Sequence, residues 1–164
     1  YALIFTEDSD MPEMIKIESD EDITPEGDEV IISCLKSNSH PKQGVMIYKI
    51  AYKDKSLVYA TDTEGFIGAN KKLVLFARDT DLLIHDAQYT TEEYLNSYFS
   101  KQGYGHSTFD MALETFSQAK AKSLAFYHYD PNYTDEFLLN IEKHYTDNCK
   151  DCFLPKEGQE IVIL

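Results

Sequence analysis

Short apolar segments separated by polar turns run along most of the chain, and most of them have the length of a β-strand. Alternating apolar and polar positions predict half-buried strands, and short continuous apolar runs predict buried ones. These patterns predict strands at residues 14–18, 30–35, 45–52, 56–61, 82–85, 123–127 and 161–164. The acidic residues 19–28 and the polar residues 53–55 are expected to form turns, the second of which closes a hairpin.

Other segments have the helical spacing of apolar positions. This spacing predicts helices at residues 68–78, 91–99, 107–120 and 135–145. The expected N-caps are Thr90 or Thr91 for the second helix, Ser107 for the third and Asp135 for the fourth. Strands come first and then alternate with helices, which predicts a layered α/β fold in one domain.

Acidic residues outnumber basic ones by 29 to 15, which gives a formal net charge of −14. The excess is concentrated in residues 1–30, where Lys16 is the single basic residue. Such a run is usual for a solvated surface, and a basic partner surface would also fit it. A non-specific nucleic-acid binder needs a basic face, so we expect that structured nucleic acid is not a partner.

No apolar stretch reaches the length of a membrane span and no signal peptide is recognisable, so we expect a cytoplasmic protein without a membrane partner. The chain begins with Tyr1 rather than methionine, and we expect the true start to lie upstream. Cys34, Cys149 and Cys152 are an odd number, which favours a reducing compartment. The spacing of Cys149 and Cys152 is interpreted as coincidence, because a zinc ribbon needs a second pair and a redox pair opens a helix after a strand.

Several predicted strands end at a residue that can bind a metal ion or move a proton. His40, Asp62, Asp86 and His128 follow apolar segments, and His85 is the last residue of one. Each instance alone is ordinary turn chemistry, as with Asp62 shortly before a glycine. Together they suggest a site along one edge of a sheet, since strand ends in α/β proteins present ligands. Imidazole and carboxylate groups suit Zn²⁺, Mn²⁺ or Fe.

These residues lie in motifs that resemble the metallo-β-lactamase-fold hydrolases, in the phosphodiesterase branch of ribonuclease Z and related cyclic-nucleotide phosphodiesterases. The matching motifs, in chain order, are SHPKQGVMIYKI, VYATDTE, DLLIHDAQYTTEEY, GYGHST and FYHYDP, followed by a last segment EGQEIVIL. The main signature of the family, H-x-H-x-D-H, is absent from the chain. The resemblance therefore implies that residues 1–164 are the C-terminal half of an αββα sandwich, a mixed sheet with helices packed on one face, without its N-terminal half.

The resemblance implies a site for two divalent metal ions, Zn²⁺ or Mn²⁺ or else Fe. His40 would bind the first ion, His128 would bind the second, and Asp62 would bridge them, beside ligands that the chain lacks. A hydroxide shared by the two ions would attack the phosphodiester. His106 would stand outside the metal shell and protonate the leaving oxygen; a histidine packed beside a helix cap is the structural alternative.

Three neighbours are expected to support these groups, namely Asp86, Ser107 and Thr108. Asp86 would orient a ligand, and a simple turn aspartate is the alternative. Ser107 and Thr108 belong to the same G-H-S-T element as His106. His85 is interpreted as a structural residue and His144 as a surface residue.

The function that these motifs favour is metal-dependent hydrolysis of a small phosphodiester, such as a cyclic nucleotide. One alternative is another reaction of the same fold, such as lactone or thioester hydrolysis. A second is a non-catalytic fragment or interaction module, because half of the metal ligands are missing. We also expect the chain to bind the missing half or to form a homo-oligomer, since half a sandwich leaves one sheet edge and part of a core uncovered.

Overall fold

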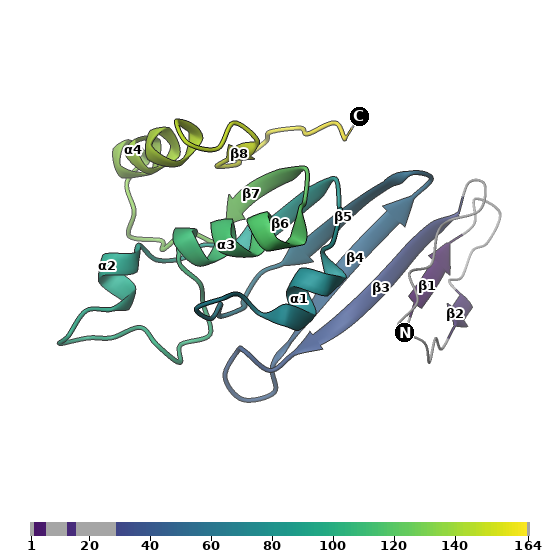
Figure 1. The fold of residues 1–164 in the computed structure, drawn as a ribbon, viewed down its shortest axis with the longest axis horizontal. Helices are drawn as coiled ribbons and strands as arrows, with labels where there is room; N and C mark the ends of the chain where they lie inside the picture. Colours follow the sequence, from purple (N-terminus) through teal and green to yellow (C-terminus); the bar gives the residue numbers. More distant parts are fainter. Residues whose placement is uncertain (1, 6–12, 16–28, 164) are drawn as a thin grey trace.

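The structure is a computed structural model, and it describes residues 2–5, 13–15 and 29–163. Its centre is a mixed sheet with the strand order β2-β1-β3-β4-β5-β6-β7-β8 (Figure 1). The strands are β1 (Ala2–Phe5), β2 (Glu13–Ile15), β3 (Val30–Ser37), β4 (Val45–Tyr52), β5 (Lys55–Ala60), β6 (Leu82–Asp86), β7 (Ser123–Tyr127) and β8 (Cys152–Phe153). Neighbouring strands from β2 to β5 are antiparallel, whereas β5, β6, β7 and β8 are parallel to one another.

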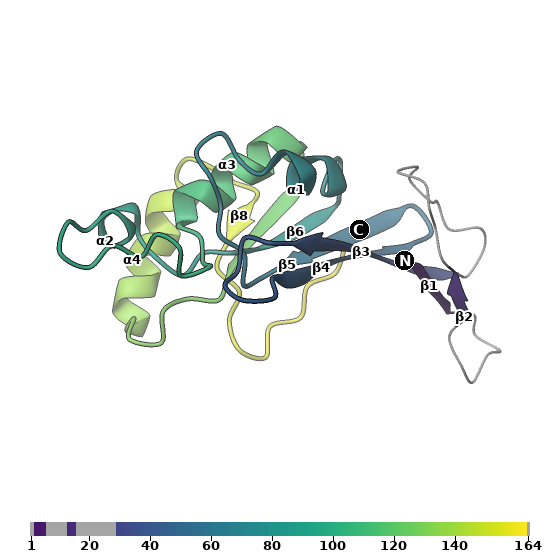
Figure 2. The ribbon, with the colours of Figure 1, turned by 90° about the horizontal axis from the view of Figure 1, so that it is seen from below.

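The helices of the described residues are α1 (Lys71–Phe76), α2 (Thr91–Tyr94), α3 (Phe109–Ala119) and α4 (Asp135–Thr146). Figure 2 shows α1 and α3 together on one face of the sheet. Between them and the sheet lies the apolar core, in which Ile47, Val58, Leu83, Phe109 and Phe126 are fully buried. The mixed sheet with its one-sided helix layer confirms the predicted fold class.

The direction of the strands brings several loops to one edge of the sheet. β5, β6 and β7 run the same way, so the segments that follow them leave the sheet side by side. β3 runs parallel to β5, because each of the two is antiparallel to β4 between them. Asp86 is the last residue of β6, and the segments after β3, β5 and β7 contain His40, Asp62 and His128, so these four residues lie at strand ends on one edge of the sheet.

α2 is much shorter than the predicted helix at residues 91–99. Thr90 caps it as expected, with a complete capping box to Glu93. The helix ends at Tyr94, and the side chain of Asn96 then accepts hydrogen bonds from the backbone N–H groups of Tyr98 and Phe99. Because asparagine offers the backbone this local alternative, the helical pattern of the segment is not realised beyond the first turn.

The N-caps of α3 and α4 lie one residue away from the predicted ones. Thr108 and Thr134 are the caps, and each hydroxyl accepts a hydrogen bond from a backbone N–H three residues on. Ser107 is not a cap, because its side chain is buried and bonds elsewhere. Asp135 is not a cap either. It lies in the first helical turn, where its negative charge interacts favourably with the helix dipole.

The last strand of the sheet is β8, not the predicted strand at residues 161–164. β8 pairs with β7, whereas residues 161–163 have no regular structure and residue 164 lies outside the described residues. Of the predicted strand at residues 14–18, β2 covers part, and the rest lies outside the described residues, as does the predicted turn at 19–28.

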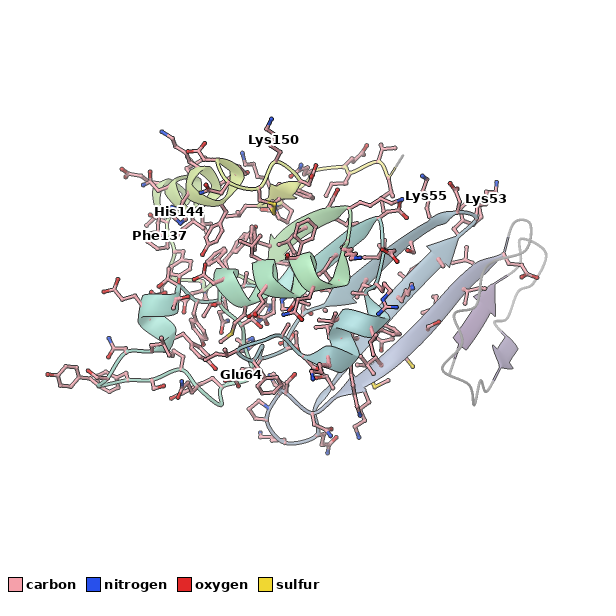
Figure 3. The ribbon with its side chains drawn as sticks, in the orientation of Figure 1. Lys53, Lys55, Glu64, Phe137, His144 and Lys150 are labelled. Atoms are coloured by element: carbon pink, nitrogen blue, oxygen red, sulfur yellow. A yellow bond between two sulfur atoms is a disulfide. The ribbon has the colours of Figure 1, made fainter. Side chains whose placement is uncertain are left out.

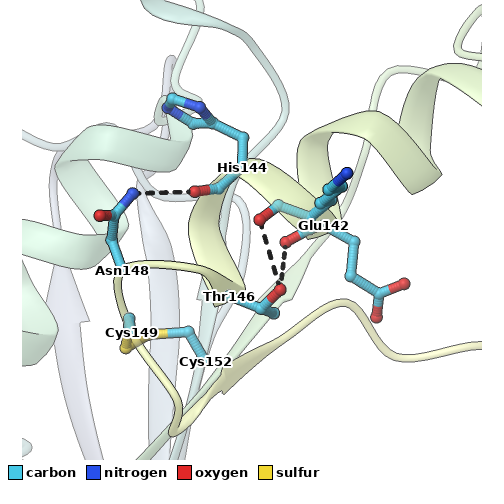
Figure 4. Close-up of a disulfide and its surroundings, with 7 residues drawn as sticks. Glu142, His144, Thr146, Asn148, Cys149 and Cys152 are labelled. Carbon is cyan, nitrogen blue, oxygen red and sulfur yellow. Dashed lines mark hydrogen bonds between the residues drawn. A yellow bond between two sulfur atoms is a disulfide. The ribbon is translucent and has the colours of Figure 1, made fainter.

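A disulfide joins Cys149, just after α4, to Cys152 in β8 (Figure 4). Their Cα atoms are 5.4 Å apart, and the backbone N–H of Cys152 donates to the carbonyl of Cys149 in the connecting turn. The interpretation of this spacing as coincidence was therefore wrong. The turn after α4 brings the two cysteines close enough to bond. Their spacing in the sequence alone could not show this. The odd cysteine count thus loses its force as an argument for a reducing compartment.

None of the helices among the described residues has the length and apolar character that a membrane crossing requires.

The sheet face opposite α1 and α3 carries exposed tyrosines. Tyr48 on β4 is paired in register with Tyr59 on β5, and the rings of Tyr59 and Tyr127 lie 6.0 Å apart. These three side chains are 37–41% exposed.

We expect the chain to self-associate and to bind an apolar dye, and expect the double variant Tyr48→Lys with Tyr59→Lys to suppress both. A monodisperse monomer in light scattering that binds no dye would contradict this prediction.

His85 makes folding sensitive to acid. It is fully buried, its Nδ1 lies 2.8 Å from the carbonyl oxygen of Asp86, and its Nε2 has no hydrogen-bond partner among the described residues. Burial lowers the pKa of His85 below its usual value of 6.5, so the folded chain keeps it neutral while the unfolded chain takes up a proton.

Stability from this group is therefore complete above pH 6.5 and falls as the pH drops below it, by at most about 1.4 kcal/mol per pH unit. We expect His85→Leu to flatten the dependence of the unfolding free energy on pH between about 6.5 and 5, measured by urea denaturation. The exposed His144 provides the control, because His144→Leu should leave that slope unchanged. Equal slopes for His85→Leu and the parent chain would refute the assignment.

Candidate metal centre

The three predicted metal ligands lie together at the strand-end edge of the sheet. Ligand atoms of His40, Asp62 and His106 are all within 4.8 Å of one another, and the same holds for Asp86, His106 and His128. Nε2 of His128 is 3.6 Å from Oδ1 of Asp62. The two groups share His106, so the five side chains form one continuous cluster.

Asp62 and His128 leave their strands in an unusual backbone conformation. Asp62 has φ = 53° and His128 has φ = 65°, both in the left-handed region that residues other than glycine seldom adopt. Each sits just past the end of a parallel strand, β5 for Asp62 and β7 for His128. The side chains of Asp62 and His128 are 40% and 35% exposed, so both can reach a bound ion or substrate. Strained positions of this kind are concentrated at functional sites.

His106 lies inside the cluster rather than beside it. Its ring is stacked on that of His128, with centroids 4.9 Å apart, and meets the ring of His40 edge-on at 5.5 Å. Nδ1 of His106 is 2.8 Å from Oδ2 of Asp86. Burial alone would lower the pKa of His106, but the hydrogen bond and charge of Asp86, with smaller contributions from other carboxylates, outweigh it and raise the pKa. The cationic form is thus favoured.

Asp86 is fully buried and combines the two roles weighed for it. Oδ2 accepts from His106, while Oδ1 accepts from the backbone N–H of Ser107 at 2.9 Å and of Gln88 at 3.3 Å. The bond to Gln88, two residues on, is turn chemistry, and the bond to His106 fixes an imidazole of the cluster. Asp86 therefore both shapes the turn after β6 and orients His106.

Ser107 ties the segment of Asp62 to the segment of His106. Its buried Oγ donates to the carbonyl oxygen of Thr63 at 2.5 Å and accepts from the backbone N–H of Gly65 at 2.9 Å. Thr108 caps α3 and pairs with Tyr89 in an isolated bridge. Both residues hold the backbone around His106 in place, and neither belongs to the two groups of candidate ligands.

Glu64 is a buried residue of the site that the sequence did not single out (Figure 3). Its Oε1 accepts from the hydroxyl of Tyr94 at 2.5 Å and from the backbone N–H of Gly103 at 2.7 Å. Its Oε2 accepts from the backbone N–H of Gly105 at 3.0 Å. One carboxylate thus fixes both glycines that precede His106. The two glycines before His106 can be recognised in the sequence, but their hydrogen-bond partner, 39 and 41 residues away, cannot.

Gly105 lies in direct contact with the loop of His40. A Cβ at this position would meet Cδ of Pro41 at 2.4 Å and Cδ2 of His40 at 2.6 Å, and φ is 92°. Only glycine fits both the conformation and the space. Gly105 directly precedes His106 and contacts the loop of His40. By accepting a hydrogen bond from Gly105, Glu64 therefore helps to hold His40 and His106 close to each other.

The donor set suits divalent metal ions. Imidazole nitrogens and a partly exposed carboxylate converge within 4.8 Å, which is the ligand chemistry of Zn²⁺, Mn²⁺ and Fe. His40, Asp62 and His128 supply three ligand positions, fewer than two ions require. His85 and His144 lie outside the cluster, one buried in the core and the other exposed on α4, as expected.

Comparison with known proteins agrees with the fold and the motif order. Residues 3–129, more than half of the chain, match the family model of the beta-lactamase superfamily domain. Ribonuclease Z of Pyrococcus furiosus is 30% identical over 107 residues, which cover 65% of this chain and 31% of that protein. Ribonuclease Z of Thermococcus gammatolerans is 36% identical over 103 residues, covering 62% and 29%. The chain thus spans about a third of the length of these relatives.

Two solved structures share the fold at low identity. The metallo-beta-lactamase fold protein YhfI from Bacillus subtilis aligns with a TM-score of 0.62 and 18% identity over 79% of this chain and 48% of its own. Human tRNase Z, short form, aligns with a TM-score of 0.59 and 20% identity over 87% of this chain and 44% of its own. With the family match over residues 3–129, these findings confirm the resemblance: the chain belongs to the beta-lactamase superfamily domain family, with the metallo-β-lactamase fold and with relatives in its ribonuclease Z branch.

Proposed function

We propose that this chain carries part of the active site of a metal-dependent hydrolase of phosphodiester bonds, with nucleotides as substrates. The observation that carries the proposal is the convergence of His40, Asp62 and His128 around a His106–Asp86 pair. Divalent ions bound there would supply Lewis acidity for the attack on phosphorus and for the charge that develops on the phosphate. The whole reaction also needs ligands beyond those in this chain.

The residues of the chain have distinct tasks in this proposal. Asp62 would hold the divalent ions through its carboxylate, and its negative charge would reduce the repulsion between the two cations. His40 and His128 would each hold an ion through an imidazole nitrogen. Asp86 lies against Nδ1 of His106 and raises the pKa of the ring, and in the favoured cationic form Nε2–H can donate to the leaving oxygen.

The His106–Asp86 pair favours phosphodiesters over thioesters as substrates. An alkoxide that leaves phosphorus needs a proton, and the hydrogen bond and charge of Asp86, which raise the pKa of His106, favour the cationic ring that can donate one. A thiolate leaving from a thioester is stable without that proton. Thioester hydrolysis would therefore leave the pair without a task, whereas lactone opening also expels an alkoxide and is distinguished from phosphodiester hydrolysis by the substrate test.

Relatives named ribonuclease Z do not fit the prediction that structured nucleic acid is not a partner. That prediction rested on a net charge of −14, which averages over a surface and says nothing of one cleft. Small or cyclic nucleotides remain our proposal for the substrate, and RNA joins them as the second candidate because of these relatives.

The test of the function is hydrolysis of bis-p-nitrophenyl phosphate and of a cyclic nucleotide by the protein that joins this chain to the upstream metal ligands. Activity that is lost on chelation and restored by Zn²⁺ or Mn²⁺ is expected. A protein that is loaded with metal but hydrolyses only thioesters or lactones would overturn the proposal.

The isolated chain should bind Zn²⁺ or Mn²⁺ weakly and hydrolyse little, because three ligands cannot fill two metal shells. We expect less than two equivalents of metal by elemental analysis after dialysis, and less still for Asp62→Asn. Asp54→Asn, on the exposed turn between β4 and β5, is the charge-matched control and should bind as the parent does. Two full equivalents in the isolated chain would show that the incomplete-shell argument is wrong.

A further inference from the structure

The segment between α2 and α3 presents large aromatic side chains to solvent next to the metal centre. In residues 95–105, Tyr98, Phe99 and Tyr104 are 87%, 81% and 58% exposed. The segment extends away from the sheet in Figure 1, and it ends directly before His106. Exposed rings in such number lower the solubility of a protein unless they serve in binding.

This loop is held in a defined shape by hydrogen bonds. Asn96 caps the backbone N–H groups at the tip, and the backbone N–H of Lys101 donates to the carbonyl oxygen of Tyr94 at 3.1 Å. At the base of the loop, Glu64 accepts from Gly103 and Gly105. The exposed rings are therefore carried by an ordered backbone, which lowers the entropic cost of binding a ligand.

A continuous series of contacts leads from His106 out to Tyr104. The ring of the buried Tyr89 meets that of His106 edge-on at 6.3 Å. The ammonium group of Lys101 lies 5.5 Å from the ring centroid of Tyr89 and 5.5 Å from that of Tyr104. Lys101 thus stands between the two rings, and Tyr104 remains more than half exposed beyond it.

We propose that Tyr104 and Lys101 form a nucleotide subsite, in which an unpaired nucleobase stacks on Tyr104 and its phosphate pairs with Lys101, next to the phosphodiester that is cleaved. This assignment rests on the proposed function, since it names the group adjoining the reacting bond. Every base has a π face, so stacking on a tyrosine accepts single-stranded or free nucleotides without reading sequence. The cation adds attraction for phosphate at the same place.

The subsite also reconciles the acidic chain with a nucleotide substrate. A protein that binds the phosphate backbone of a nucleic acid needs many basic side chains, and the net charge of −14 opposes that mode of binding. One stacking ring with one cation recognises a single nucleotide instead. Tyr98 lies in the same loop but takes no part in the ring and cation contacts of the described residues, which makes it a control for exposed aromatic surface as such.

The experiment uses the chain itself without metal, so that its result does not depend on catalysis. Binding of adenosine 5′-monophosphate, ribose 5-phosphate and a short single-stranded oligonucleotide is followed by ¹H–¹⁵N NMR at the amide of Tyr104 and by titration. We expect Tyr104→Ala to weaken the binding of the mononucleotide about tenfold or more, with ribose 5-phosphate unchanged. Tyr104→Phe, which keeps the ring, and Tyr98→Ala, which removes an unrelated ring, should bind as the parent does.

Lys101→Gln should weaken all three ligands and reduce the salt dependence of binding, because it removes the charge and keeps most of the stem. Both variants alter exposed or half-exposed side chains, and far-ultraviolet circular dichroism checks that they fold. Equal affinity of the mononucleotide and the oligonucleotide points to a free nucleotide as the ligand, and a clear preference for the oligonucleotide points to single-stranded nucleic acid. Equal affinity for ribose 5-phosphate and adenosine 5′-monophosphate, or equal losses for Tyr104→Ala and Tyr98→Ala, overturns the subsite, while nucleotide binding without metal-dependent hydrolysis overturns only the proposed function.

Discussion

Replacing Asp62 by alanine is expected to remove metal and phosphodiester hydrolysis together in the protein with its complete set of ligands. Asp62 is the carboxylate of the cluster that lies between imidazoles, 3.6 Å from His128 and within 4.8 Å of His40. Without its charge, the repulsion between two cations would be less compensated, and binding of the second ion would be lost. The loss of activity should equal or exceed the 10²–10⁴-fold typical of a missing general acid.

The backbone of Asp62 calls for a second variant. At φ = 53° an alanine is strained, so Asp62→Ala changes both charge and stability. Asparagine tolerates this conformation, and Asp62→Asn should lose metal and activity with little loss of thermal stability. Elemental analysis, initial rates and thermal unfolding are compared with those of Asp54→Asn, which removes an exposed carboxylate at the far turn of the sheet. Retention of both ions by Asp62→Asn would show that Asp62 is not the bridging ligand.

His106→Ala is expected to slow hydrolysis by about 10²–10⁴-fold and to leave the metal content unchanged. Nδ1 of His106 is bonded to Asp86, whose hydrogen bond and charge raise the pKa of the ring and favour the cationic form, which cannot ligate a metal ion. The loss should shrink for p-nitrophenyl esters, because p-nitrophenolate leaves without a proton, and should be full for alkyl esters. Asp86→Asn should lower the pKa of His106. The rate on alkyl esters should therefore begin to fall at a lower pH in this variant than in the parent.

Because His106 lies among the candidate ligands, the metal content of His106→Ala distinguishes a metal ligand from a general acid. Loss of an ion in His106→Ala would make it a ligand, and equal slowing of p-nitrophenyl and alkyl esters would make it a packing residue. His144→Ala, on the exposed surface of α4, removes a histidine without touching the cluster and should match the parent in rate and metal (Figure 3).

Much of the sheet could be read from local pattern. β4 and β7 have the predicted bounds, and β3, β5 and β6 differ by one or two residues at one or both ends. These strands have one or both faces in the core, so their apolar spacing reports their geometry directly. Four residues of the candidate site, His40, Asp62, Asp86 and His128, were also visible, because each one lies at or after the end of a strand and the topology of such folds brings strand ends together. His106 follows no strand and was visible from the motif GYGHST.

Elements decided by single side-chain bonds were less predictable. The helix at residues 91–99 stops after one turn where Asn96 bonds the backbone, and the cap of α3 moves from Ser107 to Thr108 because Ser107 is bonded to Thr63 instead. β8 could not be seen in the sequence either, since a two-residue strand has no periodicity. Its position depends on pairing with β7 and on the disulfide to the end of α4.

The sequence by itself determined the strand-rich α/β fold, the helix layer and the set of metal-type side chains at strand ends, because these follow from local periodicity and from motif order. The tertiary structure alone decided that Asp86 orients His106, that Glu64 fixes Gly103 and Gly105, and that Lys101 stands between Tyr89 and Tyr104. The physical reason is the range of the interactions. A hydrogen bond between residues 20 to 41 positions apart depends on how packed segments meet, and no pattern of neighbouring residues records it.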